Sequence, residues 1–153
     1  MSRPFISVLI DTYNHERFIE QAIRSALEQD FPVADREILI VDDGSTDKTP
    51  EILRQFEPGI RILQKTNGGQ ASAFNRGIPE CRGEIIAFLD GDDWWAANKL
   101  SCIVAAFAAK SRSGYGGPRH FGDFPRRRCS NDRAGSRATA ARFLCGRSSI
   151  PVT

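Results

Sequence analysis

Three carboxylates lie within four positions at Asp90, Asp92 and Asp93, directly after the apolar run Ile85–Leu89. Carboxylates this close repel one another and resist transfer out of water, so their clustering favours a nearby positive charge. A hard divalent ion such as Mg²⁺ or Mn²⁺ binds a few carboxylate oxygens and completes its shell with phosphate oxygens and water. The spacing therefore predicts a metal site that also meets a diphosphate. Capping of a following helix is the alternative, and it explains one acid but not all three.

A second acidic segment, Asp42-Asp43-Gly44-Ser45, follows another apolar run. Turn and capping chemistry accounts for Gly44 and Ser45 and also suits Asp43. Asp42 stands next to the apolar run, where its carboxylate is better placed to accept hydrogen bonds from a base or a ribose. We predict a functional role for Asp42, with a purely structural turn as the alternative.

Weaker signals accompany these acidic segments. The stretch NGGQ at Asn67–Gln70 can open a helix whose backbone amides face a phosphate, although glycine pairs are common in ordinary turns. Trp94 and Trp95 are most simply core or rim aromatics, and stacking against a sugar is the less common use. No G-x-x-x-x-G-K-[S/T] and no G-x-G-x-x-G occurs, so the phosphate loops of P-loop ATPases and dinucleotide-binding domains are absent from the sequence.

Strand and helix patterns alternate four times in the first 110 residues, with short connections between them. We predict strands over Phe5–Ile10, Glu37–Val41, Ile60–Gln64 and Glu84–Leu89, and helices over His15–Gln29, from Pro50 to about Phe56, from the NGGQ stretch to Ile78, and over Ala97–Ala109. This alternation is typical of an α/β fold, with a mostly parallel sheet and helices on both of its faces. Ligands of such sheets bind outside the carboxyl ends of the strands, which is where the acidic segments fall.

Composition places the chain among globular proteins. It has 153 residues, of which 41% are hydrophobic and 26% charged, enough for one domain with a sizeable core. No apolar run approaches the roughly 18 residues of a membrane span, and the N-terminus carries no signal region, so we expect a cytoplasmic location and leave contact with the inner face of a membrane open. Four scattered cysteines without a C-x-x-C pair predict free thiols.

The character of the chain changes near Lys110. Residues 1–110 carry 12 Lys and Arg against 17 Asp and Glu, whereas residues 111–153 carry 9 Arg, no Lys and 2 Asp. Only three Val, Ile or Leu occur in the second part, so we predict that 111–153 is an Arg/Gly/Ser-rich, poorly ordered tail. A tail that anchors to nucleic acid or membrane is a weaker alternative, because no aromatic or helical pattern accompanies the arginines, and we expect no nucleic-acid partner.

Four segments of the chain, in their order and spacing, resemble the family 2 glycosyltransferases. They are ISVLIDTYNHERFIEQAIRSALEQ, ILIVDDGSTDKT, NGGQASAFNRGI and GEIIAFLDGDDWW, and together they cover about residues 4–108. The resemblance implies a GT-A fold, which is Rossmann-like, and makes residues 1–110 the nucleotide-sugar-binding part of a glycosyltransferase domain. It further implies a nucleotide-diphosphate-sugar donor, a Mg²⁺ or Mn²⁺ cofactor and inversion at the anomeric carbon.

Specific roles follow from the resemblance, residue by residue. It implies that Thr12, Tyr13 and Asp42 contact the nucleoside, that Asp90 lies near the ribose, and that Asp92 meets the metal and the diphosphate.

This sequence also departs from the family pattern at two positions. Asp11 replaces a proline that the family usually has, which adds a carboxylate near the base pocket. Phe74 stands where the family commonly has arginine, so a cation that faces the phosphates is missing from that position.

The predicted function is transfer of a sugar to a saccharide or other hydroxyl acceptor. A general base must take the acceptor proton, and the acceptor half that supplies this base in the family does not follow residue 108 here. The catalytic residue therefore stays unknown, since Asp93 is the only carboxylate nearby and we do not assign it. A non-catalytic nucleotide-sugar-binding fragment is the alternative. The abrupt change at Lys110 predicts a reading-frame shift, with the rest of the enzyme encoded in another frame.

Overall fold

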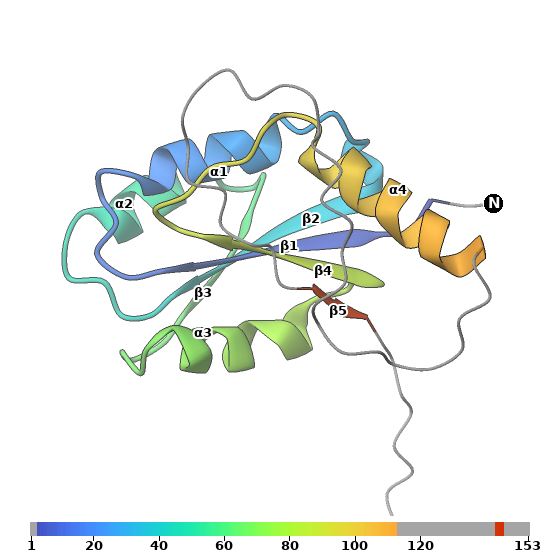
Figure 1. Cartoon of the computed structure of the whole chain (residues 1–153). Coiled ribbons are helices and arrows are strands. Elements are labelled where there is room, and N and C mark those ends of the chain that lie inside the picture. The colour runs from blue at the N-terminus through green and yellow to red at the C-terminus, as the bar shows by residue number, and fades with distance from the viewer. Residues whose placement is uncertain (1–2, 113–142, 146–153) are drawn as a thin grey trace, which may run out of the picture.

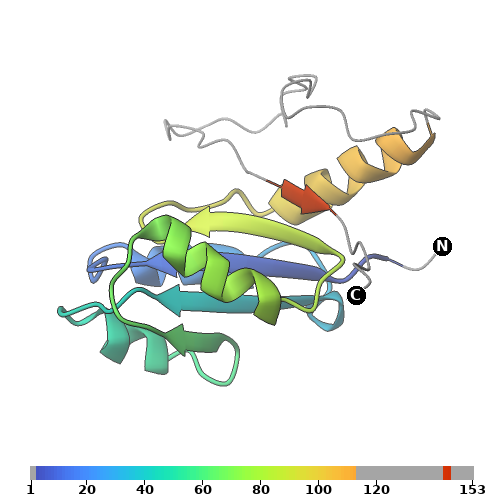
Figure 2. The same ribbon diagram turned by 90° about the horizontal axis from the view of Figure 1, so that it is seen from below.

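The computed structural model describes residues 3–112 and 143–145. Its centre is a sheet in the order β3-β2-β1-β4-β5, in which the first four strands are parallel and β5 runs antiparallel to β4. The arrows of the four parallel strands point the same way in Figure 2. The strands are β1 (Ile6–Thr12), β2 (Arg36–Asp42), β3 (Arg61–Gln64), β4 (Ile85–Asp90) and β5 (Phe143–Cys145).

Helices cover both faces of this sheet, as Figure 1 shows. Helices α1 and α4 lie on one face together with α2, and α3 lies on the other. The helices are α1 (Ile19–Leu27), α2 (Thr49–Arg54), α3 (Gln70–Gly77) and α4 (Lys99–Arg112), and two short 3-10 turns span Val33–Asp35 and Ile78–Glu80.

The core has two layers because the side chains of each strand alternate between the two faces. In β1, Ile6, Val8 and Ile10 join the larger cluster beneath α1 and α4, while Leu9 joins the smaller cluster beneath α3. All seven residues of β1 are buried, as expected for a central parallel strand covered on both faces.

The prediction of a mostly parallel α/β sheet with helices on both faces is confirmed. The strand ends differ, because β1, β2 and β4 continue through Thr12, Asp42 and Asp90 rather than ending before the polar residues. These residues pair in the ladders of the sheet, which holds them in extended backbone. Helix α4 begins at Lys99, and the backbone amide of the next residue, Leu100, donates to Oε1 of Gln29 at 3.0 Å.

The prediction of a poorly ordered tail over 111–153 lies largely outside the described residues and stays a prediction. Within that part of the chain the structure describes the end of α4 and strand β5, and the sequence had predicted no strand there. Among the residues that the structure describes, no helix is long and apolar enough to cross a membrane.

Candidate functional site

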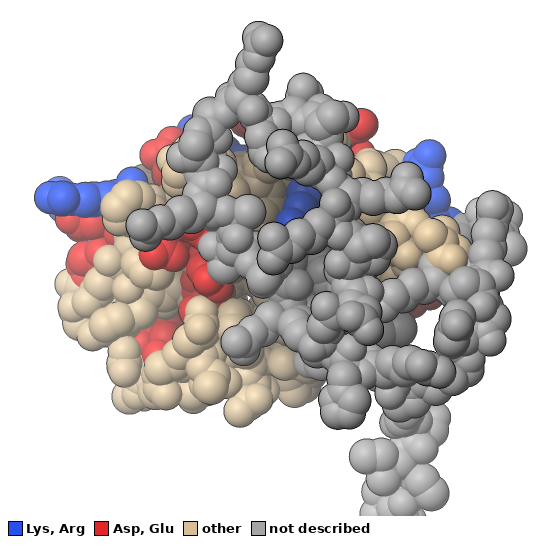
Figure 3. Space-filling view, in the orientation of Figure 1, with Lys and Arg blue, Asp and Glu red and all other residues tan. Residues whose placement is uncertain are grey.

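The strand order reverses at the centre of the sheet. The chain moves outward from β1 to β2 and β3, and then crosses back to place β4 on the other side of β1. In open parallel sheets, the crevice at such a reversal, outside the carboxyl ends of the strands, is the usual place for a ligand. Acidic side chains gather on the left of Figure 3, which is the side toward which the parallel strands run.

Register brings four of the polar residues of this crevice together in pairs. Thr12 of β1 lies opposite Asp42 of β2, and Asp11 of β1 lies opposite Asp90 of β4. Side-chain alternation places the first pair on the face of α1 and the second pair on the face of α3. Thr12, Asp42 and Asp90, which were predicted from the sequence, therefore lie at the carboxyl ends of adjacent strands, on both faces of the sheet.

Hydrogen bonds between the β1–α1 and β2–α2 loops form one wall of the crevice. Asn14 has a left-handed backbone, with φ of 54°, and its side-chain Oδ1 accepts from the amide of Thr46 at 2.7 Å. Its own amide donates to Oγ of Ser45 at 2.9 Å. The amide of Glu16 also donates to Oδ2 of Asp47 at 3.0 Å, and Oε2 of Glu16 accepts from the amide of Lys48 at 3.1 Å. Tyr13, directly before Asn14, has 43% of its surface exposed.

Asp42 has the turn-forming contact that the sequence offered as the alternative, and its role toward a ligand stays a prediction. Its side chain is 2% exposed, and Oδ1 accepts from the amide of Ser45 at 2.9 Å, which is the turn-forming interaction. Within the described part of the chain, this hydrogen bond uses only Oδ1 of the carboxylate. Thr12 is equally buried, and its hydroxyl lies 3.3 Å from Nδ1 of His15.

Asp43 has a structural role that the sequence did not reveal. Its carboxylate is buried and accepts from the amides of Gly68 at 3.0 Å and Gly69 at 2.6 Å, and it forms an ion pair with Lys65. Burial acts to raise the pKa of Asp43, but these donors outweigh it and hold the pKa below its usual range. The NGGQ amides proposed for phosphate are thus occupied by this carboxylate.

A carboxamide connects the acidic pair on the α3 face. Gln70, the first residue of α3, places its Nε2 at 3.1 Å from Oδ1 of Asp90 and at 3.4 Å from Oδ1 of Asp11. Burial and, after it, the neighbouring Asp90 together raise the pKa of Asp11 to about 7, against the lowering effect of the hydrogen bond from Gln70. The departure at Asp11 therefore puts a second carboxyl group beside Asp90 rather than beside Asp42.

The raised pKa of Asp11 predicts a pH-dependent stability. The folded chain retains a proton that the unfolded chain releases at lower pH, so this contribution to stability is present at low pH and is lost as pH rises through about 7. In metal-free buffer we expect the free energy of unfolding to fall by about 1 kcal/mol between about pH 6 and about pH 8 because of this group. Urea titrations of wild type and Asp11→Asn measure it, and an identical pH profile in the variant would contradict the prediction.

Asp92 lies in the turn after β4, and its side chain is exposed. Because α4 begins at Lys99, Asp92 and Asp93 do not cap this helix, and the capping alternative is wrong. Gly91 allows the turn to pack against β1, since a Cβ there would lie 2.7 Å from the carbonyl oxygen of Asp11 and 2.7 Å from Nδ1 of His15. The turn thus holds Asp92 exposed beside the end of β1.

The oxygen chemistry of this turn fits a hard divalent ion. Asp92 is accessible, and its charge acts on Asp11, which lies beside Asp90. No group of three or more His, Cys, Asp or Glu in the described part of the chain forms a ready-made metal site. A metal would accordingly need ligands from elsewhere, which an incoming diphosphate supplies.

Phe74, the other departure, has a packing role. Its ring meets Phe88 of β4 edge-on, with centroids 4.9 Å apart and planes at 72°, and so attaches α3 to the sheet.

Comparison with known proteins decides the family. A sequence profile described as glycosyl transferase family 2 matches residues 7–148. The chain belongs to glycosyl transferase family 2. This match runs past Lys110, where the composition changes.

Individual relatives of this family 2 member agree with the assignment. An uncharacterised glycosyltransferase of Nostoc sp. is 43% identical over 106 residues, which are 67% of this chain and 32% of the relative. TarS of S. aureus, residues 1–349 in complex with UDP, superposes with a TM-score of 0.64 and 30% identity over 75% of this chain and 38% of TarS.

A mannosyltransferase of Pyrobaculum calidifontis, in complex with GDP-Man and Mn²⁺, superposes with a TM-score of 0.59 and 31% identity over 66% of this chain and 31% of that enzyme. The chain spans about a third of the length of these proteins. The GT-A fold implied by the sequence is confirmed by these structural neighbours.

Proposed function

We propose that this chain binds a nucleoside-diphosphate-sugar and serves as the donor-binding part of an inverting glycosyltransferase. The observation that carries the proposal is that Thr12, Asp42 and Asp90 end neighbouring parallel strands at the reversal of strand order, with Asp92 exposed in the turn after β4. The complexes of TarS with UDP and of the mannosyltransferase with GDP-Man support a nucleotide in the corresponding fold.

Each wall of the crevice then has a task. Thr12, Tyr13 and Asp42 bind the nucleoside, and Oδ2 of Asp42 accepts a hydrogen bond from the base or the ribose. Asp90, held by Gln70, lies on the side of the ribose, and Asp92 holds Mg²⁺ or Mn²⁺ together with the diphosphate. A divalent ion bound there would neutralise charge on the departing diphosphate.

The reaction of the whole enzyme is an in-line displacement. The acceptor hydroxyl oxygen bonds to the anomeric carbon as the bond from that carbon to the diphosphate breaks, and configuration inverts. A general base receives the proton of the hydroxyl. We assign this role to none of the described residues.

Transfer of radiolabel from a nucleotide-sugar donor to a saccharide acceptor, measured beside donor binding, tests the proposal. Binding together with transfer identifies an active glycosyltransferase. Binding without transfer identifies a non-catalytic nucleotide-sugar-binding fragment. Failure to bind UDP- and GDP-sugars with and without Mn²⁺ would overturn the assignment of the crevice.

Substitutions at Asp42 separate nucleotide recognition from turn formation. Asp42→Ala should weaken nucleotide binding by about 1–3 kcal/mol, because a charged hydrogen-bond acceptor is lost. Asp42→Asn can keep the acceptor for the Ser45 amide and should weaken binding with little change in thermal stability. Calorimetric titration and thermal melting of both variants measure the two effects. Wild-type affinity in both would return Asp42 to a purely structural role.

A further inference from the structure

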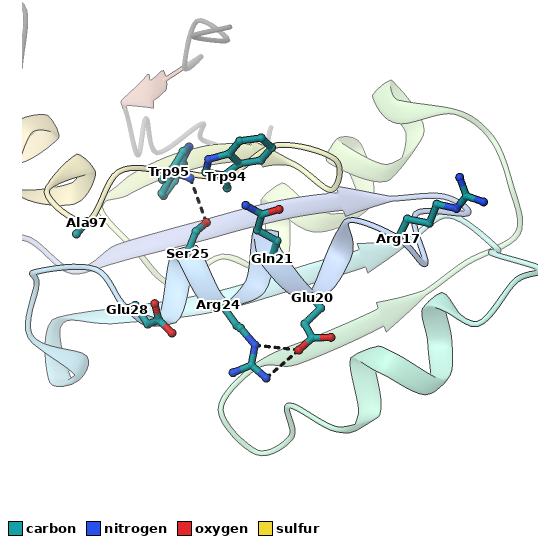
Figure 4. A pocket seen from close by; sticks show the side chains of 9 residues that line it. All are labelled: Arg17, Glu20, Gln21, Arg24, Ser25, Glu28, Trp94, Trp95 and Ala97. Atoms are coloured by element: carbon teal, nitrogen blue, oxygen red, sulfur yellow. Dashed lines mark hydrogen bonds and ion pairs between the residues drawn. The ribbon is translucent and has the colours of Figure 1, made fainter. Parts of the chain in front are cut away.

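A groove of about 610 Å³ lies between the outer surface of α1 and the loop after β4 that carries the two tryptophans. Figure 4 shows α1 side chains along one wall and Trp94 and Trp95 along the other. Its size falls within the range of small-molecule sites in proteins. None of the roles given to the donor crevice uses this groove.

The tryptophan loop is fixed to α1 by hydrogen bonds. The amide of Trp95 donates to Oγ of Ser25 at 3.1 Å, and Nε2 of Gln29 donates to the carbonyl of Ala96 at 2.9 Å. Trp95 also packs against the larger core cluster. Trp94 is thereby held on a rigid loop with 47% of its surface exposed, so a ligand that covers it meets a preformed wall.

The α1 wall offers polar groups of both charges. Glu20 and Arg24 neutralise each other through an ion pair of 2.8 Å, and the Arg24 guanidinium lies 5.4 Å from the centre of the Phe56 ring. Arg17, Gln21 and Glu28 are exposed on this wall. Gln21 points from α1 toward the tryptophans in Figure 4.

The chemistry of these walls identifies the class of ligand. A nucleic acid or an anionic membrane needs an excess of positive charge, and this groove balances two arginines with two glutamates. An apolar helix needs a stripe of apolar anchors, and the α1 wall is polar. A pyranose ring has an apolar C–H face that suits an indole and hydroxyls that suit carboxylate, carboxamide and guanidinium groups.

We propose that this groove binds an uncharged oligosaccharide segment, with Trp94 as its stacking platform. The inference rests on the proposed function, because a glycosyltransferase that extends a glycan gains from holding the acceptor beside the donor. Trp94 follows Asp92 by two residues, so the groove begins next to the proposed diphosphate site. From Arg17 to Glu28, α1 and its first turn extend about 16 Å, room for a short oligosaccharide.

Titration of the full chain with maltohexaose and with the hexamer of N-acetylglucosamine tests the proposal. Trp94 and Trp95 are the two tryptophans of the chain, so binding should change its intrinsic fluorescence. Trp94→Ala should weaken calorimetric affinity about tenfold or more, and Trp94→Phe should retain most of it. Val33→Ala, which alters an apolar side chain that is 77% exposed outside the groove, is the matched control and should bind as wild type.

The outcomes separate this inference from the proposed function. UDP or GDP binding with Mn²⁺, combined with no affinity for either hexasaccharide, overturns the groove assignment and leaves the donor crevice intact. Hexasaccharide binding that Trp94→Ala does not weaken also overturns it. A fluorescence change that follows protein concentration instead of sugar concentration indicates self-association at this face and overturns it too. Unchanged circular dichroism of Trp94→Ala shows that a loss of binding is not a loss of fold.

Discussion

Asp92→Asn is expected to abolish the Mn²⁺-dependent part of nucleoside-diphosphate binding while the fold stays intact. The side chain is exposed in the turn after β4, so the substitution removes a charge without opening the core. Groups that only support a metal ligand already contribute about 10–100-fold to metal affinity, so loss of a direct ligand should weaken metal-dependent binding about a hundredfold or more. Calorimetry with UDP and GDP, each with and without Mn²⁺, measures the difference.

The control for this experiment is Asp35→Asn, the same chemical change in the 3-10 turn before β2. This turn lies at the amino end of the strand, whereas Asp92 follows the carboxyl end of β4. Asp35→Asn should retain the metal dependence of wild type. Equal affinity of Asp92→Asn and wild type, both with and without Mn²⁺, would mean that the carboxylates after β4 do not serve a metal. Loss of binding in the absence of metal as well would instead assign Asp92 to direct contact with the nucleotide.

Asp43→Ala is expected to lower the free energy of unfolding by about 3 kcal/mol. The substitution leaves the amides of Gly68 and Gly69 without their acceptor and leaves Lys65 without its buried counter-charge. Each of these losses carries a desolvation penalty, and breaking one partner out of a buried ion pair costs about 3–5 kcal/mol in other proteins. Urea denaturation followed by circular dichroism measures the change.

Asp43→Asn refines this experiment, because its Oδ1 can still accept from the glycine amides although the charge that pairs with Lys65 is gone. Its stability should lie between those of wild type and Asp43→Ala. Because Asp43 holds the loop before α3, Asp43→Ala should also loosen Gln70 and its bonds to Asp11 and Asp90. A denaturation midpoint equal to that of wild type would show that the loop before α3 is held by other contacts.

Secondary structure and fold class were accessible from sequence because they depend on local periodicity. The largely apolar run from Ile6 to Ile10 and the stripe Ile19, Ala22, Ile23 and Ala26 correspond to β1 and α1. Element ends were less accessible. Whether β1 stops at Ile10 or continues to Thr12 depends on its ladder partners in β2 and β4, which are distant in the chain.

For the site, the sequence located the acidic segments but did not show which role each of their residues has. Asp42 and Asp43 are adjacent carboxylates with the same local signal, yet Asp42 accepts from the amide of Ser45 in its own turn, whereas Asp43 anchors the loop before α3. The glycines of NGGQ looked suited to phosphate, but their amides serve Asp43. The left-handed backbone of Asn14 and its hydrogen bonds to Ser45 and Thr46 could not be predicted from the sequence with any strength. The one signal was that asparagine tolerates a left-handed backbone.

The sequence by itself determined the α/β alternation, the polar segments at the strand ends and the resemblance to family 2 glycosyltransferases, because each is encoded in neighbouring residues. The tertiary structure alone decided which polar groups meet: Thr12 with Asp42, Asp11 with Asp90 through Gln70, and the exposed Trp94 with the polar wall of α1. These meetings depend on strand order, register and loop-to-loop hydrogen bonds. Such contacts join residues far apart in the chain, and local sequence patterns do not specify them.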